Sequence, residues 1–373
     1  MAIIKLVITC LLSLTQILTP YFTFAFGGGI DQYYDFWHYT DVFNEDDAIV
    51  LQKDPDKDFV ILNFSDVQLN PGNVYSENGE KSYELIKKCV NDLKPDLITL
   101  TGDNCSSTVG YVELIKLLDS FNIPWAPVMG NHDGQNGNRI EEARVAYQFV
   151  NAKNCLFKFG PQDMGYGNYI INITENGKII HTLFMVDTHS DAGDTEKGIV
   201  NYGINEDGTY SIGYDHLWEN QIEWYKWAVN GISKLAGNTV ESSVFMHIPC
   251  YEYRTARDLM CNKITDVNGE TEYVIKPEYK TGSNMGTLRE PVCSPEGNNG
   301  FFDTCLELGS TKTIVAGHDH TNDMALNYKG INLAYSLKGG LGSYWDEDKL
   351  GGSVLTVGSD GSASFSHYFV RFE

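Results

Sequence analysis

Basic residues are scarce in this chain of 373 residues: 27 Lys and Arg stand against 50 Asp and Glu, a formal net charge of −23. This deficit argues against a nucleic-acid partner and against binding to anionic lipid, since both require basic clusters. No Cys-x-x-Cys motif occurs, so a zinc ribbon or a thioredoxin-like redox site has little support. Downstream of residue 26 there is no hydrophobic run long enough to cross a bilayer.

The N-terminal segment, residues 1–26, has the pattern of a secretory signal peptide. An apolar run covers positions 6–18, and small residues at Thr23 and Ala25 fit a cleavage site after Ala25. The alternative is an uncleaved membrane anchor, but polar residues and Pro20 interrupt the run before it reaches ~20 apolar residues. We expect a secreted or extracytoplasmic protein without stable membrane association after cleavage.

Export also affects how the cysteines are interpreted. Once Cys10 is removed with the signal, seven cysteines remain, an odd number that leaves at least one unpaired. Cys250, Cys261, Cys293 and Cys305 flank a loop-rich stretch, where two disulfides could form in an oxidising compartment. The sequence does not rank their possible pairings.

Predicted strands then alternate with predicted helices. The apolar run 59–64 is typical of a buried strand, and the apolar residues between Tyr83 and Leu93 lie on one helical face. Short apolar runs at 97–100 and 125–128 predict two more strands. This alternation indicates an α/β fold with crossover connections.

The sequence predicts one catalytic domain, because no linker-like or low-complexity tract divides the chain. The domain covers residues 58–373 and contains a long insertion at 251–299. Residues 27–57 are acidic and aromatic. We expect them to form an N-terminal arm whose rings pack on the main domain; binding of a sugar or a partner is the alternative.

Five short segments each place candidate metal ligands directly after a predicted strand. They are Asp66-Val67-Gln68, Gly102-Asp103-Asn104, Gly130-Asn131-His132-Asp133, His247 and Gly317-His318-Asp319-His320. In open α/β sheets, ligands bind at the carboxyl ends of strands, so the five loops would converge on one crevice. Each segment alone could be a turn or a helix cap. Together, their carboxylate and imidazole groups indicate a site for Mn, Fe or Zn.

These motifs resemble those of the calcineurin-like metallophosphoesterases, over roughly residues 58–344. The stretch 294–302 (SPEGNNGFF) and the sequence GHDHTND are similar to the purple-acid-phosphatase-like branch of that family. The resemblance implies a mixed α/β (α+β) fold of four layers, in which a β-sandwich is flanked by helices. It also implies a centre of two divalent metal ions at the edge of the sandwich.

The resemblance further implies a role for each matching residue. Asp103 would bridge the two metals, and the other ligands would be Asp66 and His320 at the first metal and Asn131, His247 and His318 at the second. His132 would stay off the metals and stabilise the phosphoryl group or protonate the leaving oxygen, with Asp133 as its orienting partner.

Two positions depart from the family pattern. Gln68 stands where the family usually has the histidine of an Asp-x-His motif. As a neutral ligand, Gln68 would weaken metal binding at the first site, favour a harder ion such as Mn, or leave the site to fill only when substrate is present. Ser106 stands where purple enzymes carry a tyrosine, so the colour of a tyrosinate–iron(III) pair should be absent.

Three further residues are candidates for substrate contact: His189, Tyr251 and Arg254. Arginine offers a bidentate fork for phosphate, although Arg254 fits a surface ion pair equally well. The alternative for His189 is that it lies in a solvated loop. We expect an exported binuclear-metal phosphoesterase that hydrolyses a phosphomonoester or a small phosphodiester by attack of metal-bound hydroxide. The alternative is a catalytically weakened binding protein on the same fold, with one occupied metal site. The oligomeric state is not indicated.

Overall fold

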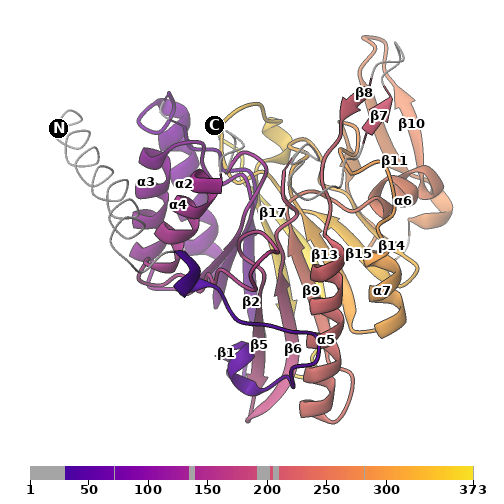
Figure 1. Cartoon of the computed structure of the whole chain (residues 1–373). Helices are drawn as coiled ribbons and strands as arrows, with labels where there is room; N and C mark the ends of the chain where they lie inside the picture. Colours follow the sequence, from indigo (N-terminus) through magenta and orange to yellow (C-terminus); the bar gives the residue numbers. More distant parts are fainter. Residues whose placement is uncertain are drawn as a thin grey trace.

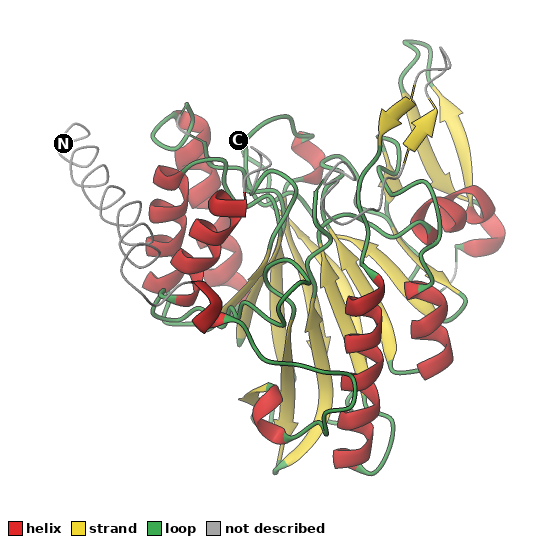
Figure 2. Ribbon diagram, viewed as in Figure 1, coloured by secondary structure: helices red, strands yellow, loops and turns green. Residues whose placement is uncertain are grey.

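The computed structural model describes residues 30–70, 72–133, 139–190, 202–204, 210–280 and 282–372. Two β-sheets lie face to face at the centre of the molecule, and helices cover their outer sides (Figures 1 and 2). The predicted signal peptide lies outside the described residues. Within them, no helix combines the length and the apolar character that a membrane span needs.

The larger sheet has seven strands. In spatial order they are β1 (Ile49–Gln52), β5 (Tyr169–Glu175), β6 (Lys178–Met185), β9 (Glu241–Met246), β13 (Thr311–Ala316), β15 (Ile331–Tyr335) and β14 (Ala325–Tyr328). Strands β6, β9, β13 and β15 run parallel to one another, and β14 pairs antiparallel with β15 at the edge.

The smaller sheet has five strands. In spatial order they are β17 (Ala363–Phe369), β16 (Gly351–Val357), β2 (Phe59–Phe64), β3 (Leu97–Thr101) and β4 (Trp125–Val128). Strands β2, β3 and β4 run parallel to one another, whereas β16 pairs antiparallel with β2 on one side and with β17 on the other. The parallel strands need helical crossovers, which explains the alternation of strands and helices in this part of the sequence.

The helices form the two outer layers. The described residues form the α-helices α2 (Glu77–Leu93), α3 (Thr108–Ser120), α4 (Arg139–Val150), α5 (Glu219–Ala236), α6 (Glu252–Met260) and α7 (Phe301–Leu308). Helices α2, α3 and α4 lie beside the smaller sheet, whereas α5 and α7 cover the larger sheet (Figure 1). The four-layer mixed α/β fold expected from the sequence is therefore confirmed.

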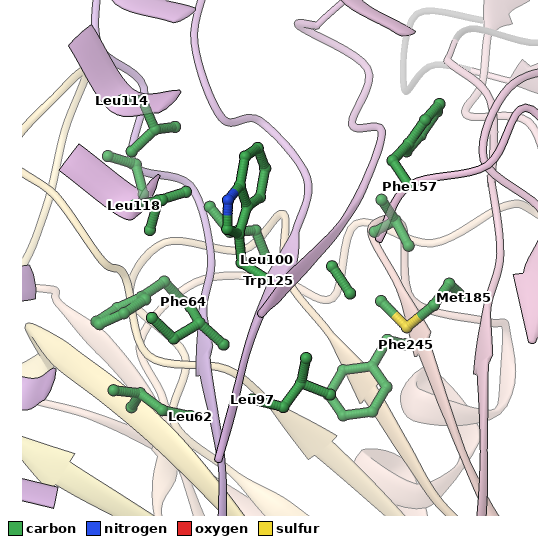
Figure 3. Packing of buried hydrophobic residues seen from close by; sticks show 14 of the residues in the cluster. Leu62, Phe64, Leu97, Leu100, Leu114, Leu118, Trp125, Phe157, Met185 and Phe245 are labelled. Atoms are coloured by element: carbon green, nitrogen blue, oxygen red, sulfur yellow. The ribbon is translucent and has the colours of Figure 1, made fainter. Parts of the chain in front are cut away.

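Side chains alternate between two cores along the strands of the larger sheet. Leu183 and Met185 of β6 join Phe245 of β9 in a core shared with the smaller sheet. Phe184 of β6 and Val244 of β9 point the other way, into the core under α5 and α7. Successive strand residues face opposite sides of a sheet, so a strand that is buried on both faces has a continuous apolar sequence. Figure 3 shows the shared core.

Aromatic rings between Tyr33 and Phe43 pack on the rest of the molecule. Tyr33 stacks on Phe159 with ring centroids 5.3 Å apart, and Phe43 contacts Trp227 edge-on at 5.0 Å. The arm also contributes something that the sequence did not predict, because its strand β1 pairs in parallel with β5 at the edge of the larger sheet. Part of the arm, residues 49–52, is thus integral to the domain.

The insertion at 251–299 is more regular than the sequence suggested. After α6 it forms a three-stranded antiparallel sheet of β10 (Cys261–Thr265), β11 (Thr271–Ile275) and β12 (Thr287–Leu288). A separate pair is formed by β7 (Tyr202–Ile204) and β8 (Tyr210–Ile212).

The two disulfides that could form around this insertion are not present in the described part of the chain, since its seven cysteines are free. Cys250, Cys261 and Cys305 are buried in the core under α5 and α7, and the Cys261 thiol faces the sulfur of Met324 at 3.4 Å. They act as small apolar core residues.

Candidate metal centre

The predicted ligand segments all lie where parallel strands end. Asp66, Asp103 and His132 follow β2, β3 and β4 of the smaller sheet, whereas His247 and His318 follow β9 and β13 of the larger sheet. The carboxyl ends of these strands meet at one edge of the sandwich, where His318 contacts Asp66 at 3.0 Å and His247 contacts Asn131 at 2.9 Å. The structure therefore brings together residues that are up to 254 positions apart.

Glycines let these loops approach one another closely. A Cβ atom on Gly130 would lie 2.2 Å from the backbone nitrogen of Asp103, and one on Gly317 would lie 1.9 Å from the Ser65 hydroxyl. Asp66, Asp103 and His318 themselves have positive φ angles of 52°, 50° and 76°. Such left-handed backbone is strained for residues other than glycine and clusters at functional sites.

Asp66, Asp103 and His320 form one buried group of potential ligands. One ligand atom from each lies within 4.8 Å of the others. The Oδ2 atom of Asp66 accepts hydrogen bonds from the Ser65 hydroxyl at 2.5 Å and from the His318 backbone at 3.0 Å. Its Oδ1 atom is buried without a hydrogen bond and lies 3.3 Å from Nε2 of His320. A cation between these atoms would satisfy both.

His320 is oriented for such a role. Its Nδ1 atom lies 3.0 Å from the Tyr344 carbonyl oxygen, to which it donates, and the two rings stack with centroids 4.2 Å apart. This contact leaves the Nε2 lone pair facing Asp66, the arrangement typical of a metal-binding histidine. Although burial opposes ionisation of Asp66, the nearby His320 holds the pKa of that carboxyl below its usual value.

Asn131, His247 and His318 form a second group beside the first. His247 donates from Nδ1 to the Thr101 carbonyl at 2.8 Å, so its Nε2 atom carries the lone pair. That Nε2 atom faces Oδ1 of Asn131 at 2.9 Å, Oδ1 of Asp103 at 3.3 Å and Nδ1 of His318 at 3.2 Å. When His247 is neutral, Nε2 and the two oxygens are all acceptors, so either a metal ion at their centre or a proton on Nε2 would satisfy them.

Electrostatics supports this reading of the second group. Burial alone would lower the pKa of His247, but Asp103 and Asp66 outweigh it and raise that pKa. Burial, together with the neighbouring His247, holds the pKa of His318 well below its usual range. His318 is therefore neutral, and its buried Nε2 atom has no hydrogen-bond partner. The residues of both groups fit divalent metal ions.

His132 lies at the rim of the centre. Its side chain is 39% exposed, its backbone N–H donates to Oδ1 of Asp103 at 2.8 Å, and its Nε2 atom lies 3.8 Å from Oδ2 of Asp103.

The Asp133 carboxylate lies on the buried side of the same turn. It accepts hydrogen bonds from the backbone of Gly130, Asn104 and Cys105 and from the Tyr111 hydroxyl. These contacts make Asp133 the residue that holds two ligand loops together, which differs from the expected direct orientation of the His132 ring. Burial and the charge of Asp103 raise the pKa of Asp133.

Gln68 is also oriented differently from what was expected of a metal ligand. Its Oε1 atom accepts a hydrogen bond from Nζ of Lys338 at 3.0 Å, and its Nε2 atom donates to Oδ2 of Asp103 at 3.0 Å. In this conformation Gln68 presents an N–H donor to the centre. An N–H donor cannot coordinate a metal, so the Lewis-basic oxygen of Gln68 is turned away from it.

The three candidates for substrate contact are engaged elsewhere. His189 stacks on Trp218 with centroids 3.6 Å apart and contacts Oε1 of Gln221 at 2.8 Å. Arg254 pairs with Glu296 at 3.1 Å and lies over the ring of Tyr251, with its Cζ atom 5.8 Å from the centroid. Arg254 thus connects two segments of the insertion.

Sequence reasoning missed two residues that contact the centre. Tyr214 places its ring edge-on to His318, with centroids 4.4 Å apart. Lys338 is fully buried and also donates to the carbonyl oxygen of Asp66 at 2.7 Å. Burial lowers the pKa of Lys338 to about 8, and the charges of Asp66 and Asp103 oppose that drop. Neither residue belongs to a motif, so no local pattern could have identified them.

A buried carboxylate–imidazole centre at the edge of a helix-flanked β-sandwich is the arrangement expected of a metallophosphoesterase. The family model of the calcineurin-like phosphoesterases matches residues 59–322, and the chain belongs to that family. The resemblance seen in the sequence is thereby confirmed.

Relatives of this chain are 28% identical to it over the aligned residues. "Probable inactive purple acid phosphatase 14" of Arabidopsis thaliana is 28% identical over 283 residues, which are 69% of this chain and 61% of that protein. "Phosphatase DCR2" of Saccharomyces cerevisiae is 28% identical over 306 residues, 74% of this chain and 46% of that protein. The chain thus spans about half of the length of these relatives.

Solved structures of similar shape include a dimetal phosphatase from Danio rerio, with a TM-score of 0.49 and 12% identity, covering 84% of this chain and 99% of that one. A purple acid phosphatase from yellow lupin seeds has a TM-score of 0.42 and 12% identity, covering 83% of this chain and 51% of that one.

Proposed function

We propose that this protein is a metal-dependent phosphoric ester hydrolase that acts on a phosphomonoester or a small phosphodiester with two divalent cations. One observation carries the proposal: two adjacent groups of buried ligand atoms face one another, and each group contains an atom without a hydrogen-bond partner. Asp66 Oδ1 and His318 Nε2 are buried without hydrogen bonds, and Nε2 of His247 lies 2.9 Å from Oδ1 of Asn131 and 3.3 Å from Oδ1 of Asp103, a position where the carboxylate attracts a cation. Buried polar atoms of this kind are costly unless a ligand satisfies them.

The residues divide naturally between two ions. Asp66 and His320 would hold the first, Asn131, His247 and His318 would hold the second, and Asp103 lies between the groups and would bridge both. The mixture of carboxylate, amide and imidazole ligands suits Mn, Fe or Zn. When bound, two such ions lower the pKa of a water molecule and stabilise the attacking and leaving oxygens of a phosphoryl group.

His132 supplies what the ions do not. Its backbone N–H is anchored on Asp103, whereas its half-exposed imidazole is free to reach a substrate at the rim. From there the ring can donate a proton to the leaving oxygen, which is the task of a general acid. The contacts of Asp133 with the backbone keep this turn in place.

The alternative function is that of a binding protein with one occupied metal site. The orientation of Gln68 favours it, because the first ion would have three protein side chains as ligands. Two further relatives, of 26% and 27% identity, also carry the words "probable inactive" in their names.

Metal analysis combined with an activity assay separates the two functions. Purified protein would be analysed for metal content and assayed with p-nitrophenyl phosphate and bis-p-nitrophenyl phosphate, with and without added Mn²⁺. About two metal ions per chain with turnover of either ester supports the hydrolase. One ion and no turnover under any added metal supports the binding protein, and a chain that takes up no metal contradicts both.

Export is part of the proposal, supported by the apolar run at positions 6–18. N-terminal sequencing of protein recovered from the medium of expressing cells tests it. A mature chain that starts after Ala25 is expected, and a chain that stays with the cells and retains residues 1–25 would contradict it.

A further inference from the structure

Lys338 differs from the other fully buried lysines in its partners. Lys53 and Lys349 each contact a carboxylate at 2.5 Å, from Glu175 and Asp323 respectively. Lys338 is 1% exposed, yet among the described residues no carboxylate lies within ion-pair distance of its Nζ atom. Its two acceptors are neutral: the carbonyl oxygen of Asp66 at 2.7 Å and Oε1 of Gln68 at 3.0 Å. A buried ammonium without a direct counter-ion requires negative charge a little further away.

That negative charge lies one hydrogen bond beyond Gln68. An ammonium group only donates, so the amide of Gln68 must turn its oxygen to Lys338 and its N–H to the other side. On that side the N–H meets Oδ2 of Asp103 at 3.0 Å. Lys338, Gln68 and Asp103 thus form a chain of donors and acceptors that ends at the first group of metal ligands.

The backbone fixes Lys338 in this position. Its carbonyl oxygen accepts from the backbone N–H of Gly351 at 3.1 Å, and a single bridge pairs Lys338 with Ser65, the neighbour of Asp66. The backbone of the lysine is therefore held between the end of β2 and the start of β16, and its side chain is buried there, 1% exposed.

We propose that Lys338 is a built-in cation of the metal centre: it compensates the charge of Asp66 and Asp103 when the first metal is absent, and it weakens binding of the first metal. The inference rests on the proposed metal centre and adds a function to it. Like charges repel strongly in a medium of low dielectric constant, so an ammonium beside the site opposes a divalent ion. The same ammonium stabilises the carboxylates of the metal-free protein. Gln68 transmits the effect, since its orientation withholds a ligand oxygen from the ion.

The test removes the charge and measures metal affinity and stability separately. Lys338→Met, Lys338→Arg and the wild type would be titrated with Mn²⁺ after chelation, and each would be melted with chelator and with saturating Mn²⁺. Lys338→Met is expected to bind the first Mn²⁺ at least tenfold more tightly, and its Tm should fall more in chelator than in Mn²⁺. Lys338→Arg keeps the charge and should resemble the wild type.

Lys349→Met is the matched control, because it removes a lysine of similar burial that pairs with Asp323. It should lower Tm equally with and without Mn²⁺ and leave Mn²⁺ affinity unchanged. The same pattern in Lys338→Met would overturn the inference. If Lys338→Met does not fold, Lys338→Gln, which retains an N–H donor, replaces it; failure of both to fold even in Mn²⁺ would show a purely structural lysine and also overturn the inference. A wild type that binds no Mn²⁺ would contradict the proposed function instead.

Discussion

At the scale of single residues, Asp103 has contacts with every part of the centre. Its carboxylate accepts from the side chain of Gln68 and from the backbone of His132, and it lies 3.3 Å from the ring of His247. These groups come from three different loops. A substitution here is therefore expected to affect metal binding, loop packing and the position of His132 together.

Asp103→Asn should lose most bound metal and nearly all phosphatase turnover. The amide removes one negative charge and places an N–H donor against the donors of Gln68 or His132, which costs ~1–3 kcal/mol for each unpaired group. Elemental analysis and p-nitrophenyl phosphate turnover measure the two effects. Full activity with two metal ions would contradict the bridging role.

His132→Ala should lower turnover about 10²–10⁴-fold, the contribution of a general acid. Metal content should stay near that of the wild type, because the backbone N–H that contacts Asp103 is retained. Parallel measurement of kcat and metal stoichiometry separates the two roles. Loss of metal would show that His132 is a ligand.

At the scale of elements, the loops after the strands of both sheets are packed backbone to backbone. The loop after β13 touches the loop after β2, since Gly317 leaves room for the hydroxyl of Ser65 and the carbonyl of Thr101. This contact couples elements that are about 250 residues apart in the chain. The contact between the two loops forms only because Gly317 has no Cβ atom.

Gly317→Ala should destabilise the protein by ~1–3 kcal/mol, because the added methyl group overpacks a rigid contact. Its Cβ atom would lie 1.9 Å from Oγ of Ser65, which itself holds Asp66. Metal affinity should fall as well. Gly297→Ala is the control, since no atom lies within 4 Å of a Cβ there; chemical denaturation curves that match for both variants would refute the argument.

The elements also show what could be predicted from the sequence. The buried strand at 59–64, the amphipathic helix that follows it, and the Asn176-Gly177 hairpin all carry local signals, and each is present. β10 was not predicted because four of its five residues are exposed and give no alternating pattern. The pairing of β1 with β5 and the position of Lys338 depend on contacts across more than 100 residues, which leave no local signal.

At the scale of the whole molecule, buried histidines outside the metal centre link folding to pH. His181 in β6 contacts both sheets, with Nδ1 2.8 Å from the carbonyl of Gly361, in the turn between β16 and β17, and Nε2 3.0 Å from the hydroxyl of Ser243 in β9. Burial lowers its pKa to about 4 from an ordinary value of 6.5. The unfolded chain therefore binds a proton that the folded chain does not between these pH values.

The stability that depends on neutral His181 is present above pH 6.5 and is lost as pH falls from 6.5 to 4, by about 3 kcal/mol in all. His181→Gln should flatten this part of the stability curve, even if the variant is less stable at neutral pH. Urea denaturation at pH 7.0, 5.5 and 4.5 measures the slope. His38→Gln, at an exposed position, is the control; parallel slopes in all three proteins would contradict the assignment.

The proposed metal centre lies where loops of the two sheets meet. The proposed ligands come from the loops after β2, β3 and β4 of one sheet and after β9 and β13 of the other, so an ion held by both sets would tie the two halves of the sandwich together. A ligand that binds only the native state stabilises it by mass action. Metal retention is then a chemical measure of whether the sheets are correctly apposed, and any substitution that lets them slide should release metal before it unfolds either sheet.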